Sequence, residues 1–237
     1  MKIQIAHICP ELLNLYGDRG NIASLLYRTK KRAIECEVRE YSPGEMPDFE
    51  NSDIIFIGGG ADKEQMAVCR ELLKYKNEFK QYVEKGKVLL ALCGGFELMG
   101  KYLKTITGEE IPCLDILDFH TEYQKERHIG NVITQSDILK TKIVGFENHS
   151  GKITGNINPL GKIVAGYGNS GNGPEGAIYK NLIASYLHGP LLPKNPVLCD
   201  YIITKALENK YGEVSLEALD DSFENSAHDY ILQKYGK

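Results

Sequence analysis

The chain lacks the features that mark membrane, secreted and nucleic-acid-binding proteins. No apolar run approaches the roughly 18 residues that a membrane span requires. Polar side chains interrupt residues 1–5 too early for a secretory apolar region. The formal net charge is -4, and no basic stripe with interleaved aromatic residues is present. We therefore expect a cytoplasmic protein that neither inserts into a membrane nor binds nucleic acid.

Signatures of metals and nucleotides are also missing. The six cysteines are scattered without a CxxC pair, so zinc-site spacing is absent and free thiols are expected. No G-x-x-x-x-G-K-[ST] phosphate loop occurs, so the sequence offers no ATP site of that kind. We expect no metal and no cofactor in this chain.

The first half of the sequence alternates between strand and helix patterns. Apolar runs predict strands over 2–8, 36–41, 53–57 and 88–93. Helical spacing predicts helices over 21–35, 63–85 and 96–103. Continuous apolar runs that stop at glycine are typical of buried parallel strands. The pattern predicts an α/β fold with a doubly wound, mostly parallel sheet.

The second half changes character. Short β-prone runs lie between glycines and asparagines at 131–134, 142–146 and 163–167. We expect these runs to be antiparallel additions to the same sheet. Two helices, within about 196–234, are predicted to close the chain. No repeat or linker interrupts the sequence, so we predict a single domain over 1–237.

A candidate nucleophile follows the apolar run that begins at residue 88. That run leads directly into Cys93 and two glycines, then into a predicted helix, as in a nucleophile elbow. The elbow requires small neighbours, which Ala91 and Gly95 supply. A helix N-terminus after the thiol should lower its pKa and direct N–H groups at developing negative charge. The alternative is that Cys93 only fills space at a strand end.

A cysteine nucleophile needs a general base. His188 stands at the end of a β-prone run and is our candidate, although only the fold can bring it to Cys93. His149 is the main competitor, because it has the same chemistry in a different setting.

Six segments together make the sequence recognisable. They are 12–21 (LLNLYGDRGN), 58–60 (GGG), 93–96 (CGGF), 127–131 (RHIGN), 145–149 (GFENH) and 186–193 (YLHGPLLP). In this order they resemble the GatD family, in the CobQ-like branch of class I glutamine amidotransferases. The resemblance implies the flavodoxin-like fold of that class.

The resemblance also implies a reaction. Cys93 attacks the side-chain carboxamide of L-glutamine and releases ammonia, with His188 as base. The oxyanion would lie between the N–H of Gly94 and an N–H of Gly59 or Gly60. Arg127 matches the family position that holds the substrate, and its guanidinium suits an α-carboxylate. The alternative for Arg127 is a solvated side chain in a charged run.

Two positions depart from the wider class I pattern. Most members carry Glu two residues after the histidine, whereas this sequence has Pro190. A Cys-His dyad is therefore implied, with Glu147 as a candidate to orient the imidazole. Glu97 stands where Gln is usual and helps to hold the substrate. Its carboxylate suits the α-amino group of glutamine, but it could also weaken binding.

The ammonia implies a synthetase partner. In the GatD family this is MurT, a Mur-ligase-like subunit of a heterodimer, on which ATP and Mg²⁺ are expected. The pair amidates the α-carboxyl of D-glutamate in lipid II, which would bring the complex near the inner membrane face. We expect the loop of Tyr16, Asp18, Arg19 and Asn21 to help dock this partner. The alternative is a polar turn in which Asn21 caps the next helix.

Three other functions remain open from the sequence. One is the glutaminase of a cobyrinate or cobyrate amidating system, which usually carries a fused ATP-binding domain. Another is a non-catalytic binding module on the same fold. The third is a cysteine peptidase on a related α/β fold.

Overall fold

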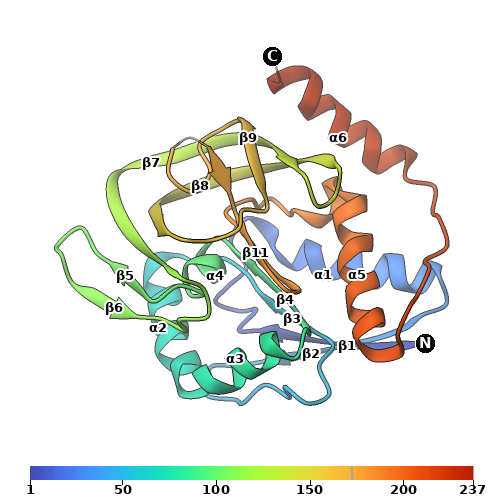
Figure 1. The fold of residues 1–237 in the computed structure, drawn as a ribbon, viewed down its shortest axis with the longest axis horizontal. Coiled ribbons are helices and arrows are strands. Elements are labelled where there is room, and N and C mark those ends of the chain that lie inside the picture. Colours follow the sequence, from blue (N-terminus) through green and yellow to red (C-terminus); the bar gives the residue numbers. More distant parts are fainter. Residues whose placement is uncertain (172, 237) are drawn as a thin grey trace.

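The structure, a computed structural model, describes residues 1–171 and 173–236 and contains two sheets with surrounding helices (Figure 1). The helices are α1 (Arg19–Lys31), α2 (Asp62–Leu72), α3 (Lys76–Glu84), α4 (Gly94–Glu97), α5 (Pro196–Tyr211) and α6 (Ser222–Tyr235). The first sheet contains β1 (Lys2–Ile8), β2 (Glu35–Tyr41), β3 (Ile54–Ile57), β4 (Val88–Leu92), β11 (Ala177–Tyr179) and β12 (Leu182–Ser185). The second contains β5 (Tyr102–Lys104), β6 (Glu110–Pro112), β7 (Phe119–Ser136), β8 (Thr141–Gly155), β9 (Gly161–Ala165) and β10 (Pro174–Glu175).

The first sheet confirms the predicted doubly wound core. Its strand order is β11-β12-β4-β3-β1-β2, and every pairing is parallel except that of β11 with β12. Both faces of this sheet are buried, since alternate residues of β3 belong to two different apolar clusters, one on each face. Ile55 and Ile57 pack with apolar residues of α2 and α3, whereas Ile54 and Phe56 pack with those of α1 and α5. A continuous apolar strand needs helices on both sides, and here it has them.

The antiparallel strands mostly form a separate second sheet, so our expectation that they extend the first sheet holds only for β11. The predicted short runs are parts of β7, β8 and β9. The long hairpin of β7 and β8 includes Gly130 and Gly145 within its strands. Both glycines resemble breaks in the sequence, which explains why longer strands were not predicted.

Two predicted helices differ from the observed ones. The helix expected over 63–85 is divided by a short 3-10 turn, Leu73–Tyr75, between α2 and α3. The helix expected over 96–103 is wrong, because α4 ends at Glu97 and β5 begins at Tyr102. Here the chain turns into the second sheet, and the N–H of Lys101 donates to the carbonyl of Phe119 at 2.8 Å.

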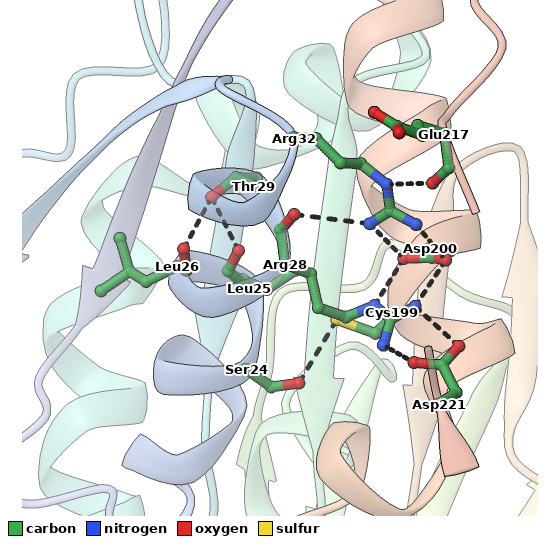
Figure 2. A network of polar contacts seen from close by, with 10 residues as sticks. All are labelled: Ser24, Leu25, Leu26, Arg28, Thr29, Arg32, Cys199, Asp200, Glu217 and Asp221. Carbon is green, nitrogen blue, oxygen red and sulfur yellow. Dashed lines mark hydrogen bonds and ion pairs between the residues drawn. The ribbon is translucent and has the colours of Figure 1, made fainter. Parts of the chain in front are cut away.

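A polar network joins α1 to α5 and to the residue that precedes α6 (Figure 2). The buried guanidinium of Arg28 on α1 donates to both carboxylate oxygens of Asp200 on α5 and of Asp221, which precedes α6. Arg32 donates to the same Asp200 and to the carbonyl of Glu217. Because α6 itself has no buried residue, this network contributes to the attachment of the segment that leads into it.

Membrane-crossing helices and metal clusters were not found in the described ranges. No helix within residues 1–171 and 173–236 is both long and apolar enough to cross a bilayer. The same residues contain no group of three or more His, Cys, Asp or Glu side chains arranged to hold a metal ion.

Candidate active site

The candidate residues gather at the carboxyl edge of the parallel sheet. The order β2-β1-β3-β4-β12 places the connections after β1 and β3 side by side at the point where the strand order reverses. Ligands of open α/β sheets bind at such points. The segments that follow β1, β3, β4 and β12 carry Asp18, Gly59, Cys93 and His188, respectively.

Cys93 occupies the strained turn between β4 and α4. Its backbone has φ 51° and ψ -110°, a conformation that costs on the order of 1–3 kcal/mol. The turn is held by the N–H of Cys93, which donates to the carbonyl of Ser185 at 2.7 Å. A Cβ on Gly95 would lie only 2.5 Å from the carbonyl oxygen of Ile57, so the position requires glycine. The predicted elbow is therefore present.

The electrostatics of the thiol differ from our expectation. Burial raises the pKa of Cys93 well above its ordinary value, and the nearby carboxylates of Glu97 and Asp18 raise it further. The N–H of Gly94 and the charge of Arg127 act in the opposite direction but do not prevail. The raised pKa favours the protonated thiol, so a nucleophilic role for Cys93 requires a base.

His188 lies next to Cys93 across Gly59. A Cβ built on Gly59 would lie 3.4 Å from Cys93 Sγ and 3.3 Å from His188 Cε1. Both side chains therefore pack against Gly59. The backbone of His188 is pinned by a two-way bridge to Phe146 of β8, with N···O distances of 2.8 and 3.2 Å. The imidazole is fully buried, and neither nitrogen has a hydrogen-bond partner among the described residues.

His149 and Glu147 are engaged elsewhere. The ring of His149 stacks on Tyr186, and its nitrogens face the carbonyl of Gly151 at 2.9 Å and the carboxylate of Glu147 at 3.3 Å. The Glu147 carboxylate also accepts from the N–H groups of Tyr167 and Gly168. It makes no contact with His188, so the suggestion that Glu147 orients that imidazole is wrong.

The glycine loop after β3 contributes fewer free donors than expected. The N–H of Gly59 donates to Asp18 Oδ2 at 2.8 Å and therefore points away from the nucleophile. The N–H of Gly94 interacts with the Cys93 thiol. Gly60 lines the cavity beside Cys93. Of the three predicted oxyanion donors, Gly60 and Gly94 remain suitable.

A cavity of about 260 Å³ opens at Cys93. Its lining includes Glu97 and Arg127, so a cation and a carboxylate face the same space as the thiol. A larger cavity of about 650 Å³ lies over β5 and β7 and does not include Cys93. The smaller cavity is the candidate site for a zwitterionic substrate.

Arg127 is placed at the cavity by an irregularity in β7. The register between β7 and β8 shifts between Tyr123 and His128, and residues 124–127 have no partner in the ladder. Bulges commonly redirect a side chain. The guanidinium of Arg127 donates to the side-chain oxygen of Asn148 at 2.9 Å and to its carbonyl at 3.3 Å. Arg127 is therefore tethered at the cavity and is not simply solvated.

Glu97 is a buried carboxylate with three protein donors. It accepts from Gln65 Nε2 at 2.6 Å, Tyr123 Oη at 3.0 Å and Tyr186 Oη at 2.9 Å. Burial nevertheless raises the pKa of Glu97 above its ordinary value. Sequence reasoning missed Gln65, Tyr123, Tyr186 and Asn148. Two of them stand in segments that the sequence analysis names: Asn148 in GFENH and Tyr186 in YLHGPLLP.

The comparisons with known proteins agree with this geometry. A family model described as the CobB/CobQ-like glutamine amidotransferase domain matches residues 4–196. The chain belongs to this family. It is 41% identical over 234 residues to the "Lipid II isoglutaminyl synthase (glutamine-hydrolyzing) subunit GatD" of Staphylococcus aureus (strain N315), covering 98% of this chain and 96% of that protein. The protein of the same description from Streptococcus pneumoniae is 36% identical, with 93% and 86% covered.

Two more distant matches of this amidotransferase agree with the family and the fold, one in sequence and one in structure. The cobyric acid synthase of Listeria innocua is 29% identical over 153 residues, which cover 61% of this chain and 30% of that one. A solved structure titled "Crystal structure of glutamine amidotransferase" superposes with a TM-score of 0.58 at 17% identity, covering 85% of this chain and 98% of that one. The predicted family, fold class and enzyme class are therefore confirmed.

The loop expected to meet a partner has a mixed environment in this amidotransferase. Asp18 and Asn21 are fully buried, so they cannot present side chains to another subunit. Asn21 lies inside α1 and accepts from the N–H of Leu192 at 2.8 Å, so it is not the helix cap. Tyr16 and Arg19 are exposed, and only they suit a docking contact.

Proposed function

We propose that this chain is the glutaminase subunit of a lipid II isoglutaminyl synthase. The observation that carries the proposal is the juxtaposition of Cys93, His188 and Gly59 at the switch point of the sheet. The proposal is supported by the relationship, along nearly the whole chain, to two subunits of that description. A non-catalytic module would have no use for the strained backbone of Cys93.

The reaction begins with glutamine in the cavity at Cys93. Arg127 binds the α-carboxylate, because a guanidinium pairs well with two carboxylate oxygens. Glu97 binds the α-ammonium group, since a cation beside this buried carboxylate stabilises its charged form. The side-chain carboxamide then lies between the thiol and the donors of Gly60 and Gly94.

Acyl transfer follows from this arrangement. His188 takes the thiol proton as Cys93 Sγ bonds to the carboxamide carbon, and the oxyanion accepts from Gly60 and Gly94. The imidazolium returns the proton to the leaving nitrogen, which departs as ammonia and leaves a γ-glutamyl thioester. Water, activated by His188, hydrolyses the thioester to glutamate. Removing one oxyanion donor typically costs about 10²–10³ in kcat.

A synthetase subunit consumes the ammonia. We assign this step to a Mur-ligase-like partner that binds ATP and Mg²⁺ and activates the α-carboxyl of D-glutamate in lipid II. The two subunits form a heterodimer, with the exposed side chains of Tyr16 and Arg19 at the docking face. An interface over the Cys93 cavity keeps ammonia away from bulk water until it meets the acyl phosphate.

Coexpression with a Mur-ligase-like subunit tests the proposal. The purified complex should amidate lipid II with glutamine and ATP. Cys93→Ala should abolish this reaction but retain amidation when ammonium chloride replaces glutamine, because only the ammonia source is removed. Glutamine-dependent activity in Cys93→Ala would refute the nucleophile. A complex that amidates cobyrinate and leaves lipid II untouched would support the cobyrate system instead.

A further inference from the structure

The imidazole of His188 has one carboxylate within reach, and that carboxylate is Asp18. His188 Nδ1 lies 3.9 Å from Asp18 Oδ2, and both side chains are fully buried. Both ring nitrogens and Asp18 Oδ1 lack hydrogen-bond partners among the described residues. In the same residues, no other carboxylate oxygen lies within 4.0 Å of either ring nitrogen. Buried polar groups are normally paired, so these orphaned atoms indicate an interaction that is nearly formed.

The carboxylate is held firmly in place. The N–H of Gly59 donates to Asp18 Oδ2 at 2.8 Å, and a Cβ on Gly58 would lie 3.1 Å from the same oxygen. The loop also packs on the segment that follows His188. A Cβ on Gly20 would lie 2.5 Å from Pro190 Cγ, so the two segments meet with no space between them. The fold therefore holds the loop of Asp18 against the segment that follows His188.

We propose that Asp18 is the positioning residue of His188. This inference rests on the proposed glutaminase function. Asp18 accepts from Nδ1–H, which selects the tautomer whose Nε2 lone pair is free for Cys93. The observed 3.9 Å must shorten by about 1 Å to become a hydrogen bond. Catalytic hydrogen bonds are often long in ligand-free sites and tighten with substrate.

The carboxylate also stabilises the intermediate charge. Nε2 takes the proton from Cys93 as the S–C bond forms and the carbonyl electron pair moves to oxygen. The resulting imidazolium faces the Asp18 carboxylate across Nδ1. The same proton then passes to the nitrogen of the substrate, the C–N bond breaks and ammonia leaves. Asp18 keeps its charge throughout and exchanges no proton.

Asp18→Asn separates this role from a structural one. The side-chain oxygen of the asparagine still accepts from the N–H of Gly59, so the loop after β1 stays in place. The negative charge is lost. Asp53→Asn is the matched control, because Asp53 is also a buried carboxylate that accepts a backbone N–H, from Gln4 at 2.8 Å. It lies at the opposite end of β3 from the site.

Both variants are assayed in the complex with its synthetase subunit. Asp18→Asn should lower kcat for glutamine hydrolysis by about 10²–10⁴-fold while KM changes less than about threefold. Thermal stability should match that of wild type, and Asp53→Asn should retain wild-type kcat. A fall in kcat of less than about fivefold overturns the proposal. The proposal is also overturned if kcat falls together with thermal stability, or if KM rises as much as kcat falls.

A measurement on the wild-type chain tests the proposal even if the Asp18→Asn variant does not fold. Histidine-selective ¹⁵N labelling, with His188→Gln to assign the signal, reports the tautomer of His188. Protonation at Nδ1 is the expected result, and protonation at Nε2 alone overturns the proposal. If Cys93→Ala is inactive with glutamine while Asp18→Asn is active, only the role of Asp18 fails. If Cys93→Ala still hydrolyses glutamine, the proposed function fails first.

Discussion

Replacing Arg28 with methionine tests what attaches the C-terminal helices. Methionine keeps much of the apolar stem but removes the guanidinium that joins α1 to Asp200 and Asp221 (Figure 2). Removing one partner of a buried ion pair typically costs about 3–5 kcal/mol, because a charge is left unpaired. Two observations favour the lower end. Asp200 keeps its pair with Arg32, and the side chains of Asp200 and Asp221 are 27% and 21% exposed.

We therefore expect Arg28→Met to lose about 3 kcal/mol of unfolding free energy. For a chain of this size, that loss lowers Tm by roughly 6–12 °C. Urea denaturation followed by circular dichroism measures the change. Lys101→Met is the control, since Lys101 and Asp118 form an exposed ion pair whose loss should not be measurable.

A double variant makes the reasoning refutable. In Arg28→Met with Asp221→Asn, the orphaned carboxylate is gone, so part of the lost stability should return. If Arg28→Met alone costs less than about 1 kcal/mol, the network does not contribute measurably to joining α1 with α5 and α6. The same conclusion follows if the double variant loses more unfolding free energy than the two single variants lose in total.

Three further predictions follow from the site and its surroundings. His188→Ala should abolish glutamine hydrolysis with an unchanged circular dichroism spectrum, whereas His149→Ala should retain most of the activity; the reverse order would make His149 the base. Arg127→Ala should raise KM for glutamine roughly ten- to hundred-fold, because a charge-assisted pair of about 1.5–3 kcal/mol is lost; an unchanged KM and kcat would mean that Arg127 does not hold substrate. Burial raises the pKa of Glu175 from 4.5 to about 8, so the folded state keeps a proton that the unfolded state releases, and stability falls as pH rises from 4.5 to 8. In Glu175→Gln, the fall in unfolding free energy between pH 5 and 8 should be smaller by on the order of 3–4 kcal/mol, as measured by urea titrations at each pH. If unfolding free energy depends on pH in the same way in both proteins, the prediction is wrong.

The sequence alone predicted the parts of the fold that depend on local pattern. Continuous apolar runs identified the parallel strands of the first sheet, because a strand buried on both faces has no polar alternation. The second sheet was not predicted as a separate unit. Its long strands include glycines within regular pairing, and register between distant segments is a property of the tertiary structure.

The same division applies to the site. Cys93 and its small neighbours were predictable, because an elbow requires a buried strand, a nucleophile and glycines within a few consecutive residues. The positions of Arg127 and Asp18 were decided by the fold. A bulge in β7 turns Arg127 to the cavity, and the loop after β1 buries Asp18 against His188. Asp18 and His188 are far apart in the sequence, so no local pattern relates them. They meet because parallel strands deliver their carboxyl ends to one edge of the sheet.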